Sequence, residues 1–83
     1  MEKSIYTPEY EVLLRLLRET RERAGVTQVE LAQKLGQTQS FVSKIELGDR
    51  RLDLVQLRTI LSVLGMRLVD FVDRFERELE GRP

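Results

Sequence analysis

The 83-residue sequence contains no cysteine and no histidine. Without cysteine, neither disulfide bonds nor thiolate metal sites can form. Without histidine, the chain lacks the commonest metal ligand and the commonest general base near neutral pH. No other nucleophile stands beside a base in an evident motif, and a domain of this size has little room for a cleft. We therefore expect a protein that is not an enzyme and that uses no metal or cofactor.

Long apolar runs are also missing. No segment approaches the roughly 18 apolar residues that span a bilayer, and residues 1–10, MEKSIYTPEY, lack the apolar core of a signal peptide. We therefore expect a cytoplasmic protein with no membrane partner. The length predicts a single domain over residues 1–83. A domain this small buries only about 60% of its unfolded surface, so stabilisation by dimerisation is a reasonable expectation.

The formal net charge is zero, but the charges are unevenly distributed. Residues 15–51 carry eight Lys or Arg against five Asp or Glu, whereas the rest of the chain carries six against nine. Much of the acid lies in residues 70–80, DFVDRFERELE. Because local charge governs attraction to phosphates, residues 15–51 form the segment that suits nucleic acid.

Apolar residues recur at helical spacing and no strand pattern is present, which predicts an all-α fold of five helices. Thr7 precedes a first helix with Pro8 at its first position, and Thr27 with Glu30 forms a capping box for a short second helix. Thr38 caps a third helix over residues 39–47. A fourth helix follows a cap signal at Asp53 and Gln56, and a fifth spans about 67–80. The expected ends of the first four helices are Gly25, Gly36, Gly48 and Gly65.

The first and fifth helices each have one predicted apolar face. In the first helix it consists of Leu13, Leu16, Leu17, Thr20 and Ala24. In the fifth helix it consists of Leu68, Phe71, Val72, Phe75 and Leu79, and its two phenylalanines exceed what a small terminal helix needs to cover a core. We expect a dimer surface there, formed by Leu68, Phe71, Val72 and Phe75. The alternative is that the two phenylalanines complete the core of one monomer.

The third helix has a polar face that differs from an ordinary solvated one. A helical wheel places Phe41, Val42 and Ile45 on the core side. The opposite side consists of Gln39, Ser40, Ser43, Lys44 and Leu47, without the Glu–Lys pairs of a solvated helix. Gln can bond bidentately to adenine, Ser can bond to several base edges, and Lys can bond to guanine. This face predicts readout in a DNA major groove; the alternative is a merely soluble surface.

Residues 27–48, TQVELAQKLGQTQSFVSKIELG, resemble the helix-turn-helix of the phage Cro/repressor family, also called the Xre family. The resemblance covers roughly residues 10–75 and implies a five-helix, lambda-repressor-like DNA-binding domain. It implies base reading by Gln39, Ser40 and Lys44, with Ser43 facing the groove or the backbone. The phosphate-binding residues that it implies are Gln28, Thr38, Arg50, Arg51 and Arg21.

The resemblance also pairs Arg21 with Glu46, which would tie the first helix to the third and orient the arginine toward the DNA backbone. For Phe41, core packing competes with a contact to the sugar–phosphate wall or to a thymine methyl group. Leu47 stands where many relatives carry a polar residue, which suggests an apolar contact with the groove or with a partner.

The leading functional hypothesis is a transcriptional regulator, of the repressor type, that binds a double-stranded palindromic operator as a homodimer. Half-sites would lie about one turn apart, ~34 Å. A second hypothesis is an antitoxin that binds a toxin and its own promoter, and RNA polymerase is a further candidate protein partner. A third is an interaction module without DNA binding, but it would give Gln39, Lys44, Arg50 and Arg51 no reason to lie together.

Overall fold

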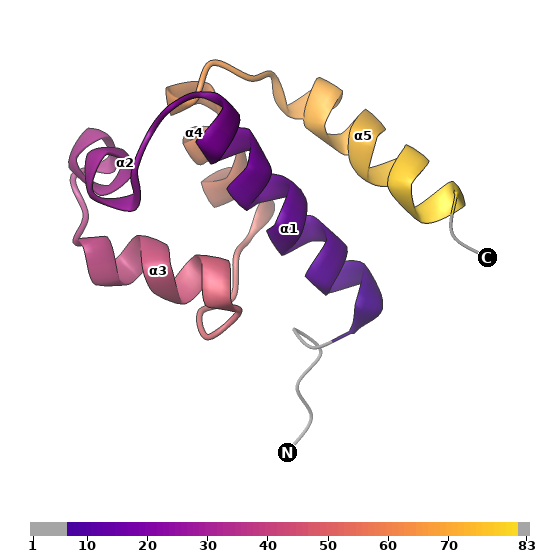
Figure 1. Ribbon diagram of the computed structural model, residues 1–83, viewed down its shortest axis with the longest axis horizontal. Helices are drawn as coiled ribbons and strands as arrows, with labels where there is room; N and C mark the ends of the chain where they lie inside the picture. The colour runs from indigo at the N-terminus through magenta and orange to yellow at the C-terminus, as the bar shows by residue number, and fades with distance from the viewer. Residues whose placement is uncertain (1–6, 82–83) are drawn as a thin grey trace.

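The helices of the computed structural model follow the predicted order. The structure describes residues 7–81, and within this range it contains five α-helices and no strand (Figure 1). The helices are α1 (Pro8–Arg23), α2 (Gln28–Leu35), α3 (Gln39–Leu47), α4 (Leu54–Val63) and α5 (Leu68–Glu80). The all-α prediction is therefore confirmed. Of the segment predicted to lack a signal peptide, residues 1–6 lie outside the described range.

Four helices begin at a side chain that the sequence predicts as a cap. The hydroxyl oxygens of Thr7, Thr27 and Thr38 each accept a hydrogen bond of 3.1 Å from the backbone N–H three residues ahead. Asp53 accepts a bond of 2.7 Å from the backbone N–H of Gln56. Each cap satisfies a helix N–H that has no partner within its own helix. The caps therefore set where these helices start.

The turns after α2 and α3 depend on glycine. Gly36 has φ of 69° and Gly48 has φ of 85°, a left-handed conformation that other residues adopt only with strain. Beyond Gly36, the Gln37 N–H donates to the carbonyl of Ala32 at 2.9 Å. The chain thereby turns within a few residues, so that α2 and α3 pack against each other.

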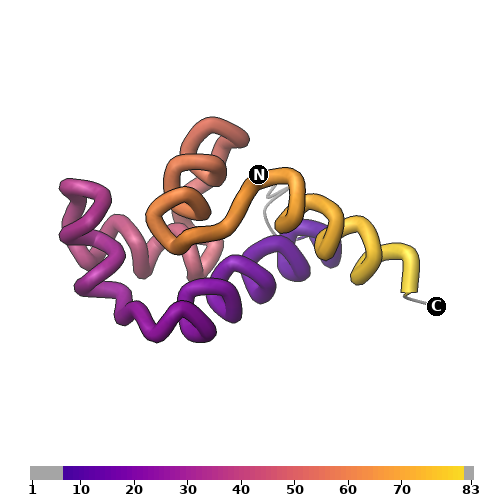
Figure 2. The backbone as a smooth tube through the Cα atoms, turned by 90° about the horizontal axis from the view of Figure 1, so that it is seen from above, coloured from indigo at the N-terminus to yellow at the C-terminus, as the bar shows by residue number. Residues whose placement is uncertain are grey.

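The core is formed by side chains from all five helices. It comprises Val12, Leu16, Leu17, Leu31, Ala32, Val42, Ile45, Leu57, Ile60, Leu61 and Phe71. α5 runs antiparallel beside α1, away from α2 and α3 (Figures 1 and 2). Ion pairs join these two helices, with Arg15 of α1 3.0 Å from Glu78 and Arg74 of α5 3.9 Å from Glu19.

The buried face of α1 differs from the predicted one. Val12 and Leu14 are buried in addition to Leu16 and Leu17, because α1 packs against α3 on one side and α5 on another, whereas the predicted Leu13 is only half-buried. Ala24 is exposed, since it caps the end of α1 beyond the packed turns. A central helix therefore buries more residues than those of the one apolar face that the sequence predicts.

The predicted dimer surface on α5 needs a similar correction. Phe71 is only 1% exposed and belongs to the monomer core, so it has no surface to offer a partner. Leu68 and Phe75 are half-buried against the same core, whereas Val72 is 39% exposed. The neighbouring Val69, absent from the prediction, is 57% exposed.

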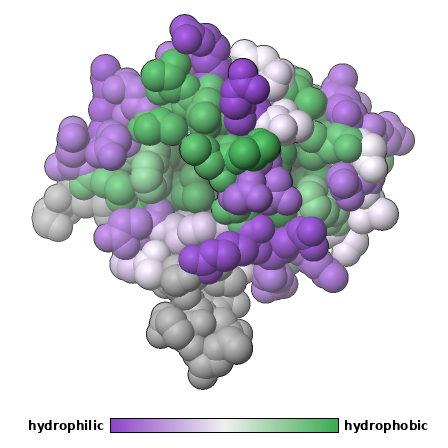
Figure 3. All heavy atoms as spheres, turned by 180° about the vertical axis from the view of Figure 1, so that it is seen from behind, coloured by the Kyte–Doolittle hydropathy of each residue, from purple (hydrophilic) through white to green (hydrophobic). Residues whose placement is uncertain are grey.

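Six large hydrophobic side chains of residues 7–81 are exposed: Val29, Leu47, Leu54, Val55, Val69 and Val72. Viewed from the side where α4 is nearest, hydrophobic residues gather across the middle of the surface and hydrophilic ones border them (Figure 3).

Among the described residues, no helix is long and apolar enough to cross a membrane.

Candidate nucleic-acid interface

The outer face of α3 is polar, as the helical wheel predicts. Gln39, Ser40 and Lys44 are exposed and Ser43 is half-buried. Beneath them, Val42 and Ile45 are 3% and 1% exposed and anchor the helix in the core. α3 therefore presents its hydrogen-bonding side chains on a surface whose backbone is held from below.

A buried ion pair ties α3 to α1. Arg21 Nε lies 2.6 Å from Glu46 Oε2, and Arg21 Nη2 lies 3.1 Å from Glu46 Oε1. Arg21 Nη1 donates to the carbonyl of Val26 at 2.8 Å, at the entrance to α2. The hydrogen bonds to Glu46 raise the pKa of Arg21 above its ordinary value, so the guanidinium stays charged. One arginine thus connects α1, the start of α2 and the end of α3.

The position of Arg21 bears on its expected role at the DNA backbone. The predicted pair with Glu46 is present, but Arg21 is only 8% exposed and all three of its side-chain nitrogens donate within the protein. These three bonds leave two of the five guanidinium N–H groups, so the phosphate contact of Arg21 remains a prediction. The structure gives Arg21 a positioning role.

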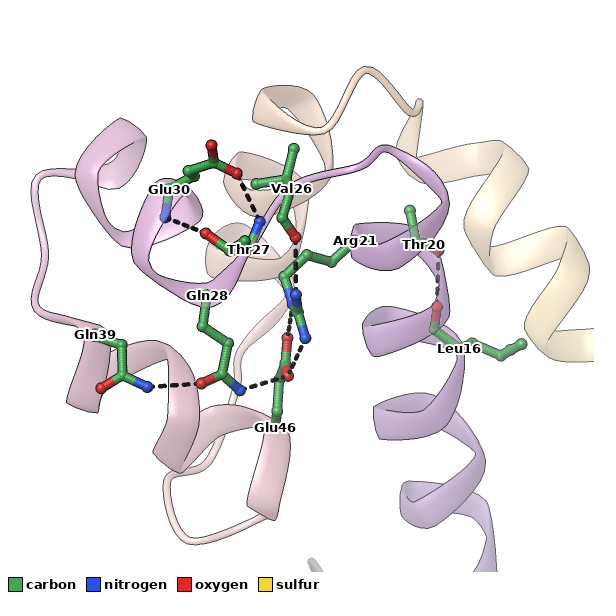
Figure 4. Close-up of polar contacts among 9 residues, drawn as sticks. All are labelled: Leu16, Thr20, Arg21, Val26, Thr27, Gln28, Glu30, Gln39 and Glu46. Carbon is green, nitrogen blue, oxygen red and sulfur yellow. Dashed lines mark hydrogen bonds and ion pairs between the residues drawn. The ribbon is translucent and has the colours of Figure 1, made fainter.

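Hydrogen bonds continue from this pair to the surface. Gln28 Nε2 donates to Glu46 Oε1 at 2.9 Å, and Gln39 Nε2 donates to Gln28 Oε1 at 2.7 Å (Figure 4). An ionised carboxylate only accepts hydrogen bonds, so Glu46 directs the amide nitrogen of Gln28 inward and its oxygen toward Gln39. That oxygen in turn attracts the amide nitrogen of Gln39. The buried carboxylate therefore sets the direction of both amides.

The contact between Gln28 and Gln39 was not predicted from the sequence. These residues are the first of α2 and the first of α3, and only the turn between the helices brings them together. The contact leaves Gln39 with an oxygen and one N–H, and Gln28 with one N–H. The phosphate contact of Gln28 remains a prediction, and the amide keeps a donor with which to make it.

The other predicted phosphate-binding residues flank α3. Thr38 precedes the helix, Arg50 and Arg51 follow it, and all three are exposed. The loop that carries the arginines is fastened to α3, because the backbone N–H groups of Asp49 and Arg50 both donate to the carbonyl of Lys44, at 2.9 and 3.1 Å. The guanidinium of Arg50 lies 4.7 Å from the centre of the Phe41 ring. Cationic groups therefore border the polar face of α3.

The geometry of α2, the turn and α3 is that of a helix-turn-helix domain. Within residues 7–81 no cluster of acidic residues could hold a metal ion.

A helix-turn-helix family model matches residues 17–71, which is more than half of the chain. The solved structure of an XRE-family like protein from Pseudomonas syringae pv. tomato str. DC3000 superposes with a TM-score of 0.83. The two chains are 41% identical over 92% of this chain and 93% of the other.

No significant match is found among curated proteins. The family model and the solved relative agree with each other, and together they place the chain in the XRE family of helix-turn-helix proteins. Membership of this family supports a DNA-binding regulator.

Proposed function

We propose that the protein is a transcriptional regulator that recognises a specific double-stranded DNA sequence with α3 in the major groove. A major groove about 12 Å wide admits a single α-helix. In a helix-turn-helix, the second helix enters the groove and its N-terminal residues contact the bases. The family membership and the exposed polar face of α3 support this arrangement.

The orientation of the Gln39 side chain is the main support for this proposal. Its amide has one oxygen and one N–H left after the bond to Gln28. Adenine presents an N6 donor and an N7 acceptor side by side, which match that remaining pair. Because the side chain is already held, little rotational entropy remains to be lost on binding. We therefore expect Gln39 to read an adenine in each half-site.

The remaining residues divide into two groups by their position. Ser40, Ser43 and Lys44 lie along the outer face of α3 and would contact base edges in the same groove. Thr38, Arg50, Arg51 and Gln28 lie around the ends of α3 and would contact phosphates, which position the protein without reading sequence. We propose repression as the form of regulation, because it requires only that the protein occupy its operator.

We further propose that two copies bind a palindromic operator and associate through the outer surface of α5. Val69 and Val72 are exposed and lie three residues apart, on neighbouring positions of the same helix. A surface hollow of about 480 Å³ adjoins Val69, and its lining is partly apolar, with Met66 and Leu68, and partly cationic, with Arg58 and Arg67. Asp73 and Glu76 are exposed on the same helix as Val69 and Val72, and their negative charge would keep α5 away from DNA.

Two substitutions test the division between base and phosphate contacts. Gln39→Ala should lower the preference for adenine over other bases by ~1–3 kcal/mol at one position of each half-site. Arg51→Ala should weaken binding to all sequences alike and reduce the salt slope by roughly one unit. Binding is measured by titrating labelled duplexes at several salt concentrations.

Arg77→Ala is the matched control for Arg51→Ala. It removes the same charge from α5, where Arg77 pairs only with Asp73 at 3.0 Å among the described residues. It should leave both affinity and salt slope near those of the unmodified protein. Equal effects of Gln39→Ala on chosen and random DNA would contradict the base-reading role.

The dimer surface is tested by Val72→Asp, measured by sedimentation over a range of protein concentrations. A carboxylate placed in a buried apolar contact should shift the protein toward monomer, because the charge would have to be desolvated. Val29→Asp makes the same change at an exposed valine of α2 and should leave the association unchanged. A monomer at all concentrations before substitution, or a dimer that survives Val72→Asp, would refute the surface.

A further inference from the structure

The side chain of Arg50 reaches back along α3. Arg50 is the third residue after the end of α3, and Phe41 is the third residue from its start. The two side chains nevertheless meet, with the guanidinium carbon 4.7 Å from the centroid of the phenyl ring. The positive charge is therefore held beside the N-terminal half of α3, two residues from Gln39.

The two partners differ in how firmly they are fixed. Phe41 is half-buried and packs against the core cluster, whereas Arg50 is exposed. No carboxylate in residues 7–81 forms an ion pair with Arg50. The ring thus provides a fixed platform for a side chain that would otherwise sample many rotamers, and the charge above it is not neutralised by a neighbour in that range.

We propose that Phe41 is a positioning residue for DNA binding, whose ring holds the Arg50 guanidinium against a phosphate that flanks the base pair read by Gln39. This inference rests on the proposed function and adds to it a role for an aromatic residue that contacts no base. An exposed cation over an aromatic ring is stabilised by ~0.5–1 kcal/mol, which corresponds to about a two- to five-fold gain in affinity if the bound geometry is the one preformed. Core packing alone would give Phe41 no such coupling to Arg50.

The test is a double-mutant cycle on binding to a random-sequence duplex at 0.15 M salt. Arg50→Ala should weaken binding roughly five-fold, the effect of losing one phosphate contact through counterion release. Phe41→Leu, which keeps an apolar side chain against the core, should weaken binding about two- to five-fold. In the Arg50→Ala background, Phe41→Leu should have no further effect, since the cation that the ring holds is gone.

Two controls separate positioning from packing. Phe41→Tyr keeps an aromatic ring and should restore the affinity that Phe41→Leu loses. In the protein without DNA, the side-chain protons of Arg50 should show an upfield ring-current shift in NMR spectra, retained in Phe41→Tyr and lost in Phe41→Leu. Thermal unfolding of each variant establishes that it is folded. If Phe41→Leu does not fold, Phe41→Met replaces it, because methionine also keeps an apolar side chain against the core and has no ring face for the cation.

The outcomes distinguish this inference from the proposed function. If the aliphatic variant at Phe41 weakens binding equally with and without Arg50, Phe41 acts only in the core and the inference fails. If Arg50→Ala leaves affinity unchanged, the inference fails together with the phosphate role of Arg50. Base reading by Gln39 is judged separately, by its own substitution on selected DNA.

Discussion

The buried pair of Arg21 and Glu46 makes a sharp prediction, because it should control folding stability and DNA reading by separate routes. Its side chains are 10% and 5% exposed and meet through two hydrogen bonds of 2.6 and 3.1 Å. Removing one member of a buried pair leaves the other charge without compensation and typically lowers stability by 3–5 kcal/mol, far more than the ~0.2–1 kcal/mol of an exposed pair. In a domain of this size, a loss of ~3 kcal/mol lowers Tm by roughly 12–24 °C.

The double variant Arg21→Met/Glu46→Leu separates the two roles. Apolar residues of similar volume replace both charges and leave no unpaired ion, so most of the stability lost in Glu46→Ala should return. The preference for adenine should not return, because Gln28 has lost the carboxylate that orients it and, through it, Gln39. Stability is measured by urea unfolding, and base preference by titration of duplexes that differ at single positions.

Two results would refute this reasoning. A loss below 1 kcal/mol in Glu46→Ala would show that the pair behaves as an exposed one. A double variant that recovers stability and still prefers adenine would show that the orientation of Gln39 does not depend on Glu46. The phosphate contacts serve as the internal control, since affinity for random DNA should change little in a folded double variant.

Two further predictions concern local structure. Hydrogen bonds from the Thr27 backbone N–H and hydroxyl lower the pKa of Glu30 below its ordinary value of 4.5. The capping box therefore contributes stability that is fully present above about pH 4.5 and is lost as pH falls through the lower pKa of the folded protein. Glu30→Gln should show a shallower loss of Tm between roughly pH 5 and pH 3, and an unchanged slope would contradict the role of the Glu30 carboxylate in the cap. Gly48→Ala should lower stability more than Gly36→Ala. Both substitutions add strain of roughly 1–2 kcal/mol at positive φ, but only Gly48→Ala brings a methyl group 3.2 Å from the Leu14 side chain. Equal losses of stability in urea unfolding would count against that contact.

Much of the fold follows from local signals in the sequence. Thr27, Thr38 and Asp53 act as caps through bonds to residues three positions away, and Gly36 and Gly48 adopt backbone angles that favour glycine. Such interactions involve neighbours along the chain, so spacing is enough to predict them. The polar face of α3 is predictable for the same reason, since one helical period determines which side chains face outward.

What the sequence does not reveal depends on how the helices meet. Phe71 and Val72 are adjacent and both apolar, and only the packing of α5 on α1 and α4 decides that the first is buried and the second exposed. The resemblance pairs Arg21 with Glu46, but only the packing of the helices shows that this pair is buried. The bond from Gln39 to Gln28 joins the starts of two helices, so no periodic pattern within either helix contains it.

The most direct test of the central claim is to select bound sequences from a random duplex library at physiological salt. We expect a palindromic motif with half-site centres about ten base pairs apart and an adenine in each half that Gln39→Ala no longer selects. Absence of any enriched motif, or an identical motif with and without Gln39, would contradict the claim that α3 reads DNA through this residue.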